Sequence, residues 1–160
     1  MEDKRITKTK CALKSALLDL LTTQAFDVIS ITELCKIANV SRITFYTHYK
    51  DKFALLDDIF NDMLIIGKEG YHRRQEENNP ENNLTQGYLN VLDSILSLYY
   101  ERYDFFQHVV PETNPYLAFR FYRILLDTVE SHTDKLKASY SLKYSARQIA
   151  GFICFGLFGF

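Results

Sequence analysis

The stretch that decides the fold covers residues 30–52 and reads SITELCKIANVSRITFYTHYKDK. It opens with Ser30 and Glu33, which have the spacing of a capping box, in which a hydroxyl and a carboxylate satisfy free amides at the start of a helix. A short helix therefore begins near residue 31. It ends at Asn39, because asparagine tolerates the left-handed backbone that a helix end often requires.

A second short helix follows directly. Ser41 is a favourable N-cap, and the helix that it starts runs from Arg42 to about Tyr49. Small Ala38 permits close packing of the two helices, and Val40 anchors the turn in the core. Two short helices joined in this way form a helix-turn-helix, in which the first helix supports the second for insertion into the major groove of DNA. The stretch therefore predicts a DNA-binding element.

The helical pattern extends over the rest of the chain. Only three prolines interrupt it, at positions 80, 111 and 115, and the apolar residues between them recur at intervals of three and four. The fold class is therefore predicted to be all-α. Besides the two short helices, the pattern predicts helices over residues 7–22, 51–75, 84–103, 116–133 and 143–160.

The charge divides the chain near residue 52. Residues 1–52 hold nine Lys and Arg against six Asp and Glu, a balance of +3, whereas residues 53–160 hold ten against fourteen, a balance of −4. The positive charge thus accompanies the helix-turn-helix, as a nucleic-acid footprint requires. We predict a three-helix helix-turn-helix domain over residues 1–52 and a helical bundle over residues 53–160. The uncharged run 149–160 has no stop signal, so we expect its helix to continue beyond residue 160.

The cysteines and the apolar segments bear on the compartment. Cys11, Cys35 and Cys154 lie far apart and lack the spacing of a zinc or redox site, so we interpret them as buried thiols of a reducing compartment. No apolar signal segment follows the charged N-terminus, and the run 149–160 is too short to span a bilayer. These features predict a cytoplasmic protein.

Residues 31–52 closely resemble the DNA-binding domain of the TetR/AcrR family of transcription regulators. The resemblance covers about the first third of the chain, and its Thr-Phe-Tyr-x-His-Tyr-x-x-Lys portion, residues 44–52, is far more restrictive than a bare helix-turn-helix pattern. One departure is Asn39, where the family usually has glycine. Both residue types tolerate a positive φ, so the turn is expected to form.

The resemblance assigns roles to individual side chains. From the spacing alone, Phe45 and Tyr49 point to the core. The residues left for solvent or DNA are Arg42, Thr44, Tyr46, Thr47 and His48. The resemblance implies phosphate contacts from Thr32, Ser41, Tyr46, His48 and Lys52, and base or groove contacts from Arg42, Thr44 and Thr47. It also implies a homodimer, formed through the last two long helices of a variable helical domain that often holds an effector pocket.

The second half of the chain offers a tentative effector pocket. Aromatic residues at helical spacing can line such a cavity, although they more often form plain core. The candidates are Tyr88, Tyr99, Tyr103, Phe106, Phe119 and Tyr122. Arg102, Arg120, Arg123 and His108 can hold an anionic ligand if they point inward, but solvated arginines are the commoner case.

The glycine series Gly151, Gly156 and Gly159 lies among phenylalanines near the C-terminus. Such a stripe lets helices approach closely, which suits a dimeric four-helix bundle, and an intramolecular core explains it nearly as well. We favour the dimer interface, because the stripe is apolar on more sides than one partner helix covers.

The sequence thus predicts a homodimeric regulator that binds a palindromic operator, represses transcription and is released by a small-molecule effector. The alternative is a co-activator or interaction module of the same fold that does not bind DNA. No nucleophile and base or metal-ligand arrangement is visible, so we expect no enzyme, metal or cofactor. His48 has no ligand-spaced partner nearby, which favours a phosphate contact over a metal or catalytic role.

Overall fold

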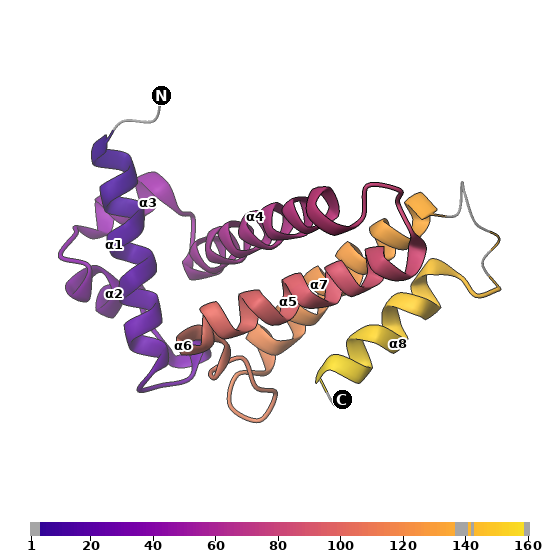
Figure 1. Ribbon diagram of the computed structural model, residues 1–160. Helices are drawn as coiled ribbons and strands as arrows, with labels where there is room; N and C mark the ends of the chain where they lie inside the picture. The colour runs from indigo at the N-terminus through magenta and orange to yellow at the C-terminus, as the bar shows by residue number, and fades with distance from the viewer. Residues whose placement is uncertain (1–3, 137–140, 142, 159–160) are drawn as a thin grey trace.

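The computed structural model describes residues 4–136, 141 and 143–158, and every regular element among these residues is a helix. The all-α prediction is confirmed. The elements in chain order are α1 (Lys4–Leu21), the 3₁₀ turn η1 (Phe26–Val28), α2 (Ile31–Ile37), α3 (Arg42–His48), α4 (Lys52–Asn78), α5 (Leu84–Glu101), α6 (Tyr103–Phe106), α7 (Pro115–Leu136) and α8 (Ala146–Phe158) (Figure 1). Within the described ranges, no helix combines the length and the hydropathy that a bilayer span requires.

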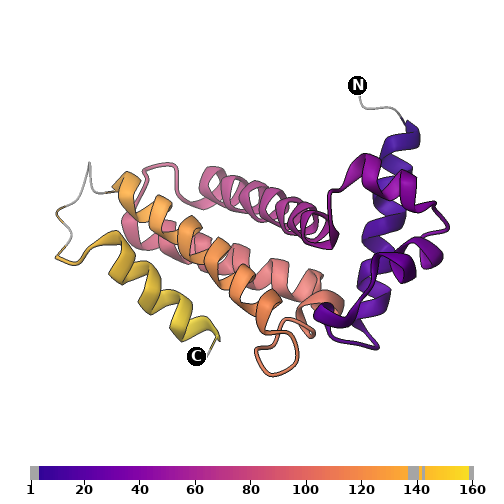
Figure 2. The same ribbon diagram turned by 180° about the vertical axis from the view of Figure 1, so that it is seen from behind.

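The helices form two parts. α1, α2 and α3 cluster at one end of the molecule, and α4 leads away from this cluster toward the far end, where the chain turns back into α5 (Figures 1 and 2). α5, α7 and α8 run alongside one another, with α4 packed on α5 and α7 packed on α8. The start of α4 also contacts α1, so the first part of the molecule includes the beginning of this helix.

Most predicted helices agree with the structure to within a few residues, and the differences lie at chain reversals. α4 continues to Asn78, past the predicted end at residue 75, and stops where the amide of Asn79 donates to the carbonyl of Gln75 over 3.1 Å. The helix predicted over 84–103 is divided, because the backbone of Arg102 leaves the helical conformation with φ −120° and ψ 32°. The last helix begins at Ala146 rather than at residue 143, and residues 159–160 lie outside the described part.

A closed apolar core holds the first part together. Leu13 and Leu17 of α1, Leu34 of α2, Phe45 of α3 and Leu56 of α4 are all fully buried. Their burial supplies most of the favourable free energy of folding in this part, at roughly 25 cal/mol per Å² of apolar surface. The packing of these side chains against one another holds α2 and α3 at a fixed angle.

The predicted burial of the cysteines was wrong at one position. Cys11 lies on the exposed side of α1, whereas Cys35 and Cys154 are buried free thiols. Burial raises the pKa of the Cys154 thiol to about 11, so this sulfur is a packing group. Cys11 lies at the edge of the apolar stripe of α1, where a small apolar side chain can remain exposed.

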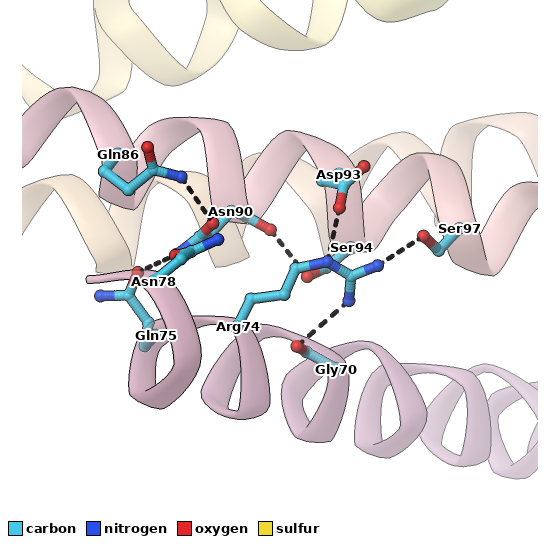
Figure 3. A network of polar contacts seen from close by, with 9 residues as sticks. All are labelled: Gly70, Arg74, Gln75, Asn78, Gln86, Asn90, Asp93, Ser94 and Ser97. Atoms are coloured by element: carbon cyan, nitrogen blue, oxygen red, sulfur yellow. Dashed lines mark hydrogen bonds and ion pairs between the residues drawn. The ribbon is translucent and has the colours of Figure 1, made fainter. Parts of the chain in front are cut away.

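Arg74, near the end of α4, connects this helix with the second half of α5 (Figure 3). Its guanidinium donates to Asp93 over 2.5 Å, to Ser97 over 2.7 Å and to the carbonyl of Gly70 over 3.2 Å. A Cβ added at Gly70 would lie 3.2 Å from Nη1 of Arg74, so the glycine gives the guanidinium its place against the helix. The planar fork of arginine suits such a multiple contact better than lysine.

Buried Asn90 continues the row of polar contacts around Arg74 toward the turn between the two helices. We call this row the polar seam. The side-chain nitrogen Nδ2 of Asn90 donates to Gln75 over 2.5 Å and to Asn78 over 2.8 Å, while its side-chain oxygen Oδ1 accepts from Gln86 over 3.1 Å (Figure 3). A fully bonded buried amide specifies a single register of the two helices, because any shift would leave its polar atoms unpaired. The seam therefore fixes the distal half of α4 against α5.

Candidate nucleic-acid interface

The start of α2 is fixed by the predicted capping box. The hydroxyl of Ser30 accepts from the amide of Glu33 over 3.2 Å, and the carboxylate of Glu33 accepts from the amide of Ser30 over 2.9 Å. The hydrogen bonds from the Ser30 side chain and backbone lower the pKa of Glu33, so its carboxylate stays ionised at neutral pH. Thr32 lies exposed in this first turn, where a phosphate contact is sterically open.

The turn between α2 and α3 is a Schellman motif. The amide of Val40 donates to the carbonyl of Cys35 over 3.0 Å, and the amide of Asn39 donates to the carbonyl of Lys36 over 3.3 Å. Asn39 has the positive φ of 53° that this motif requires, as its position in the sequence predicted. The tight reversal brings the second helix across the first without an intervening loop.

Ser41 starts α3 in the predicted way. Its hydroxyl accepts from the amide of Thr44 over 3.0 Å and lies 2.8 Å from the Thr44 hydroxyl. The two hydroxyls share a hydrogen bond in which either can be the donor. The Thr44 amide and both hydroxyls at this helix start are therefore satisfied locally.

α3 has a buried face and an exposed face. Phe45 is fully buried and Tyr49 nearly so, while Ile43 has 82% of its surface exposed. Because successive helical residues are about 100° apart, Thr47 and Ile43 point directly away from the two buried rings. Arg42, Tyr46 and Thr47 are also exposed, and Thr44 and His48 are half-buried.

Tyr49 fastens the end of α3 to the neighbouring helices. Its hydroxyl donates to Asp58 of α4 over 2.6 Å, and Lys14 of α1 contacts Asp58 at 3.1 Å and Asp62 at 2.5 Å. Burial opposes the charged form of Asp58, but the hydrogen bonds from Tyr49 and Lys14 outweigh it and lower the pKa of this carboxyl. Burial followed by the contact with Asp58 raises the pKa of Tyr49, so its phenol remains a donor.

Lys52 has a different position from the one that the resemblance implies. Its ammonium donates to the carbonyls of Phe26, Asp27 and Ile29 over 2.9, 2.7 and 2.8 Å. Lysine has three N–H donors, and these three carbonyls use all of them. Burial lowers the pKa of Lys52, with nearby Asp27 acting in the opposite direction. In this structure Lys52 closes the 3₁₀ turn η1, and a phosphate contact would require it to give up one of these bonds.

The other predicted contact residues lie in the first turn of α2, at the N-cap of α3 and along α3. Sequence reasoning assigned no role to Ile43, although it lies one helical turn before Thr47 and on the side opposite Phe45. The available signal was this spacing, combined with a large apolar side chain that no core helix covers. The exposed side of α3 is therefore apolar at its centre and polar at its flanks.

A cavity of about 160 Å³ lies in the second part, between α4, α5 and α7. Its walls are mainly apolar, with a few hydroxyl, imidazole and ammonium groups. The lining residues include Phe60, Met63, Leu64, Val91, Ile95, Leu98, Phe121, Ile124 and Leu125, together with the polar residues Lys68, Tyr71, His72, Ser94, Thr128, Ser131, His132 and Lys135. Such walls suit a small and largely apolar ligand with one or two polar groups.

None of the six aromatic residues predicted for an effector pocket lines this cavity. Tyr99 and Phe106 stack on each other with ring centroids 5.4 Å apart, and Tyr103 is exposed. Phe119 and Tyr122 line a separate open groove of about 270 Å³ beside α8. Two of the six thus line a groove rather than this cavity, because helical spacing places the aromatic residues on a face without showing which neighbouring helix that face meets.

The sixth residue, Tyr88, does not line the cavity but contacts His132, which does. Its hydroxyl is 2.8 Å from that of Thr133, and its ring meets the edge of His132 at a centroid distance of 5.4 Å. His132 itself lines the cavity, and its Nδ1 lies 3.4 Å from the hydroxyl of Tyr71. Its Nε2 is shielded from solvent and has no hydrogen-bond partner. Burial and then Lys135 lower the pKa of His132, so the ring is neutral at neutral pH.

The two parts of the molecule meet at η1. The amide of Phe26 donates to the side chain of Asn114 over 2.7 Å, and the ring of Phe26 stacks on Tyr116 at a centroid distance of 5.6 Å. Arg120 of α7 forms an ion pair with Asp57 of α4. These contacts connect α7, which lines the cavity, with the part that carries α3.

Known proteins resemble this chain both in sequence and in structure. No family model matches the chain. Over 58 residues the chain is 40% identical to the uncharacterized HTH-type transcriptional regulator YxbF of Bacillus subtilis (strain 168), and the match covers 36% of this chain and 14% of that protein. The chain therefore spans far less than two thirds of this relative.

The second similarity is structural. The dihydroxyacetone kinase operon activator DhaS superposes with a TM-score of 0.54 and 24% identity, over 91% of this chain and 80% of that one. At this identity the likeness shows the fold alone.

Proposed function

We propose that this protein is a homodimeric, DNA-binding transcription regulator of the TetR/AcrR type. The observation that carries the proposal is the exposed face of α3, which a capping box, a Schellman turn and a fully buried Phe45 hold at a fixed angle. A two-turn helix presented in this way fits the major groove. The 40% identity to a helix-turn-helix regulator over 58 residues supports the same function.

The outer side of α8 is the proposed dimer interface. Ala146, Ala150 and Cys154 are buried toward α7, whereas Phe152 is 82% and Phe155 51% exposed. A Cβ added at Gly151 or Gly156 would meet nothing within 4 Å, so these glycines leave open space on the protomer surface. A two-fold pair formed through α7 and α8 presents two copies of α3 to one face of DNA, which requires a palindromic operator with half-sites about 34 Å apart.

The cavity between α4, α5 and α7 is the proposed effector site. A ligand there touches α4 and α7. α4 begins a few residues after α3, and the start of α7 contacts η1 through Tyr116 and through Asn114, which directly precedes this helix. Occupation can thus shift the first part relative to the bundle, with a coupling of roughly 1–3 kcal/mol that releases the operator. Without ligand, the dimer stays on the operator and represses transcription by blocking polymerase.

The test is selection of binding sites from random duplexes, followed by fluorescence anisotropy on the selected site across a salt series. We expect affinity to fall linearly with the logarithm of salt concentration. Arg42→Ala should cost roughly 1–3 kcal/mol of binding free energy and relax specificity at one base pair. Arg73→Ala, which removes the same charge from an exposed position on the distal half of α4, is the matched control.

A folded dimer that binds no duplex would contradict the proposal and favour the co-activator alternative. The sign of regulation needs a separate measurement, because the structural neighbour is named an activator. A promoter fusion that becomes more active when the chromosomal copy is deleted indicates repression. Loss of activity in the same assay indicates activation.

A further inference from the structure

The centre of the exposed face of α3 is apolar. Ile43 and Thr47 are one helical turn apart and point away from the buried rings of Phe45 and Tyr49. Ile43 is 82% exposed, the same fraction as Phe152 at the proposed dimer interface. A β-branched side chain at an exposed helical position adds nothing to helix stability, and Ile43 is available to a partner surface that covers it.

The threonine hydroxyls beside Ile43 are already used. The hydroxyl of Thr47 donates to the carbonyl of Ile43 over 3.0 Å, and that of Thr44 shares a hydrogen bond with Ser41 over 2.8 Å. A threonine whose hydroxyl bonds back to its own helix presents its methyl group to the outside. Ile43 and the two threonine methyl groups therefore form one apolar strip, with Tyr46 on one flank and His48 on the other.

We propose that α3 reads its operator by apolar contact with thymine C5-methyl groups, made by Ile43 and by the methyl groups of Thr44 and Thr47. The inference rests on the proposed function and specifies how that function selects DNA. Thymine is the only base that presents a methyl group in the major groove, so an apolar strip selects A·T pairs at the positions that it covers. Arg42 and the flanking residues then supply the polar contacts.

The experiment uses the full chain and duplexes in which each thymine of the selected half-site is replaced, one at a time, by deoxyuridine. This change removes one methyl group and leaves every hydrogen-bonding atom of the base pair. Fluorescence anisotropy should show a loss of about fourfold in affinity at the contacted positions, the effect expected for uncovering one methyl-sized group. Ile43→Ala should weaken binding and remove the sensitivity at its own position.

Two substitutions at Thr47 separate the methyl group from the hydroxyl. Thr47→Ser keeps the hydroxyl and loses the methyl, whereas Thr47→Val keeps the methyl and loses the hydroxyl. We expect the valine variant to bind about fourfold more tightly than the serine variant. Thr9→Ser on α1 is the matched control, because the Thr9 hydroxyl bonds to the carbonyl of Arg5, four residues back, in the same way.

Tighter binding by Thr47→Ser than by Thr47→Val would overturn the inference and assign the contact to the hydroxyl. Equal affinity for thymine and deoxyuridine duplexes at every position would also overturn it, while the proposed function stood. Absence of binding to any duplex would instead remove the proposed function and this inference together. Thermal unfolding of each variant shows whether a loss of binding reflects loss of the fold.

Discussion

The helix-turn-helix and the cavity between α4, α5 and α7 are built in opposite ways. In the helix-turn-helix, the helix caps and the turn are satisfied by partners three to five residues away, and the core contains fully buried Phe45. In the bundle, polar partners such as Tyr71 and His132 come from distant parts of the chain, and about 160 Å³ stays open between them. The difference fits the proposed division into a rigid element that reads DNA and an adaptable body that binds a ligand.

The largest expected effect comes from truncating the closed core. Phe45→Ala should lower the free energy of unfolding by about 3–5 kcal/mol, because the surrounding side chains cannot fill the space. Phe121→Ala in the cavity wall should cost less, since part of that ring already faces open space and loses fewer contacts. Urea unfolding of both variants measures the difference, and an equal or larger loss for Phe121→Ala would contradict the proposed contrast in packing.

Lys52 offers a second way to sharpen the comparison. Lys52→Met removes the three bonds to the carbonyls at η1, and we expect it to lower the free energy of unfolding by about 1–3 kcal/mol. Urea unfolding measures this loss, and Lys50→Met, at an exposed neighbouring position, is the control. If Lys52 served DNA phosphates alone, its replacement would leave stability unchanged and lower only the salt dependence of binding.

His132 should produce a smaller effect, which depends on pH. Burial lowers its pKa in the folded state, so below the unfolded value of about 6.5 the unfolded chain takes up the proton first, and stability falls as pH decreases. For one proton the slope cannot exceed about 1.4 kcal/mol per pH unit. Comparing wild type with His132→Gln between pH 7.5 and 5.5 tests this. A variant with the same loss on acidification would exclude His132 as the cause.

The helix-turn-helix could be predicted from the sequence because its determinants are local. Ser30, Glu33, Asn39 and Ser41 each fix a helix end within a few residues, and the structure confirms all four positions. The exposed position of Ile43 follows from the same spacing. The engagement of Lys52 with the carbonyls of η1 could not be predicted, because that turn lies more than twenty residues earlier in the chain.

The cavity could not be predicted for a related reason. Helical periodicity places Tyr99 and Phe106 on apolar faces, but only the rotation and crossing of α5, α6 and α7 decide whether those faces meet a void or each other. The residues that line the cavity, such as His132 and Tyr71, are separated by sixty positions. Their juxtaposition depends on tertiary packing, and no short motif records it.

The most direct test of the central claim places a negative charge at the middle of the exposed face of α3. Thr47→Glu should weaken operator binding at least about a hundredfold in fluorescence anisotropy, because a carboxylate in the groove is repelled by the phosphates, and it should leave the unfolding midpoint near that of wild type. Thr85→Glu, an exposed position in the first turn of α5 at the far end of α4, carries the same charge change and should bind as wild type does. Wild-type affinity in the Thr47→Glu protein would contradict the claim that this face of α3 contacts DNA.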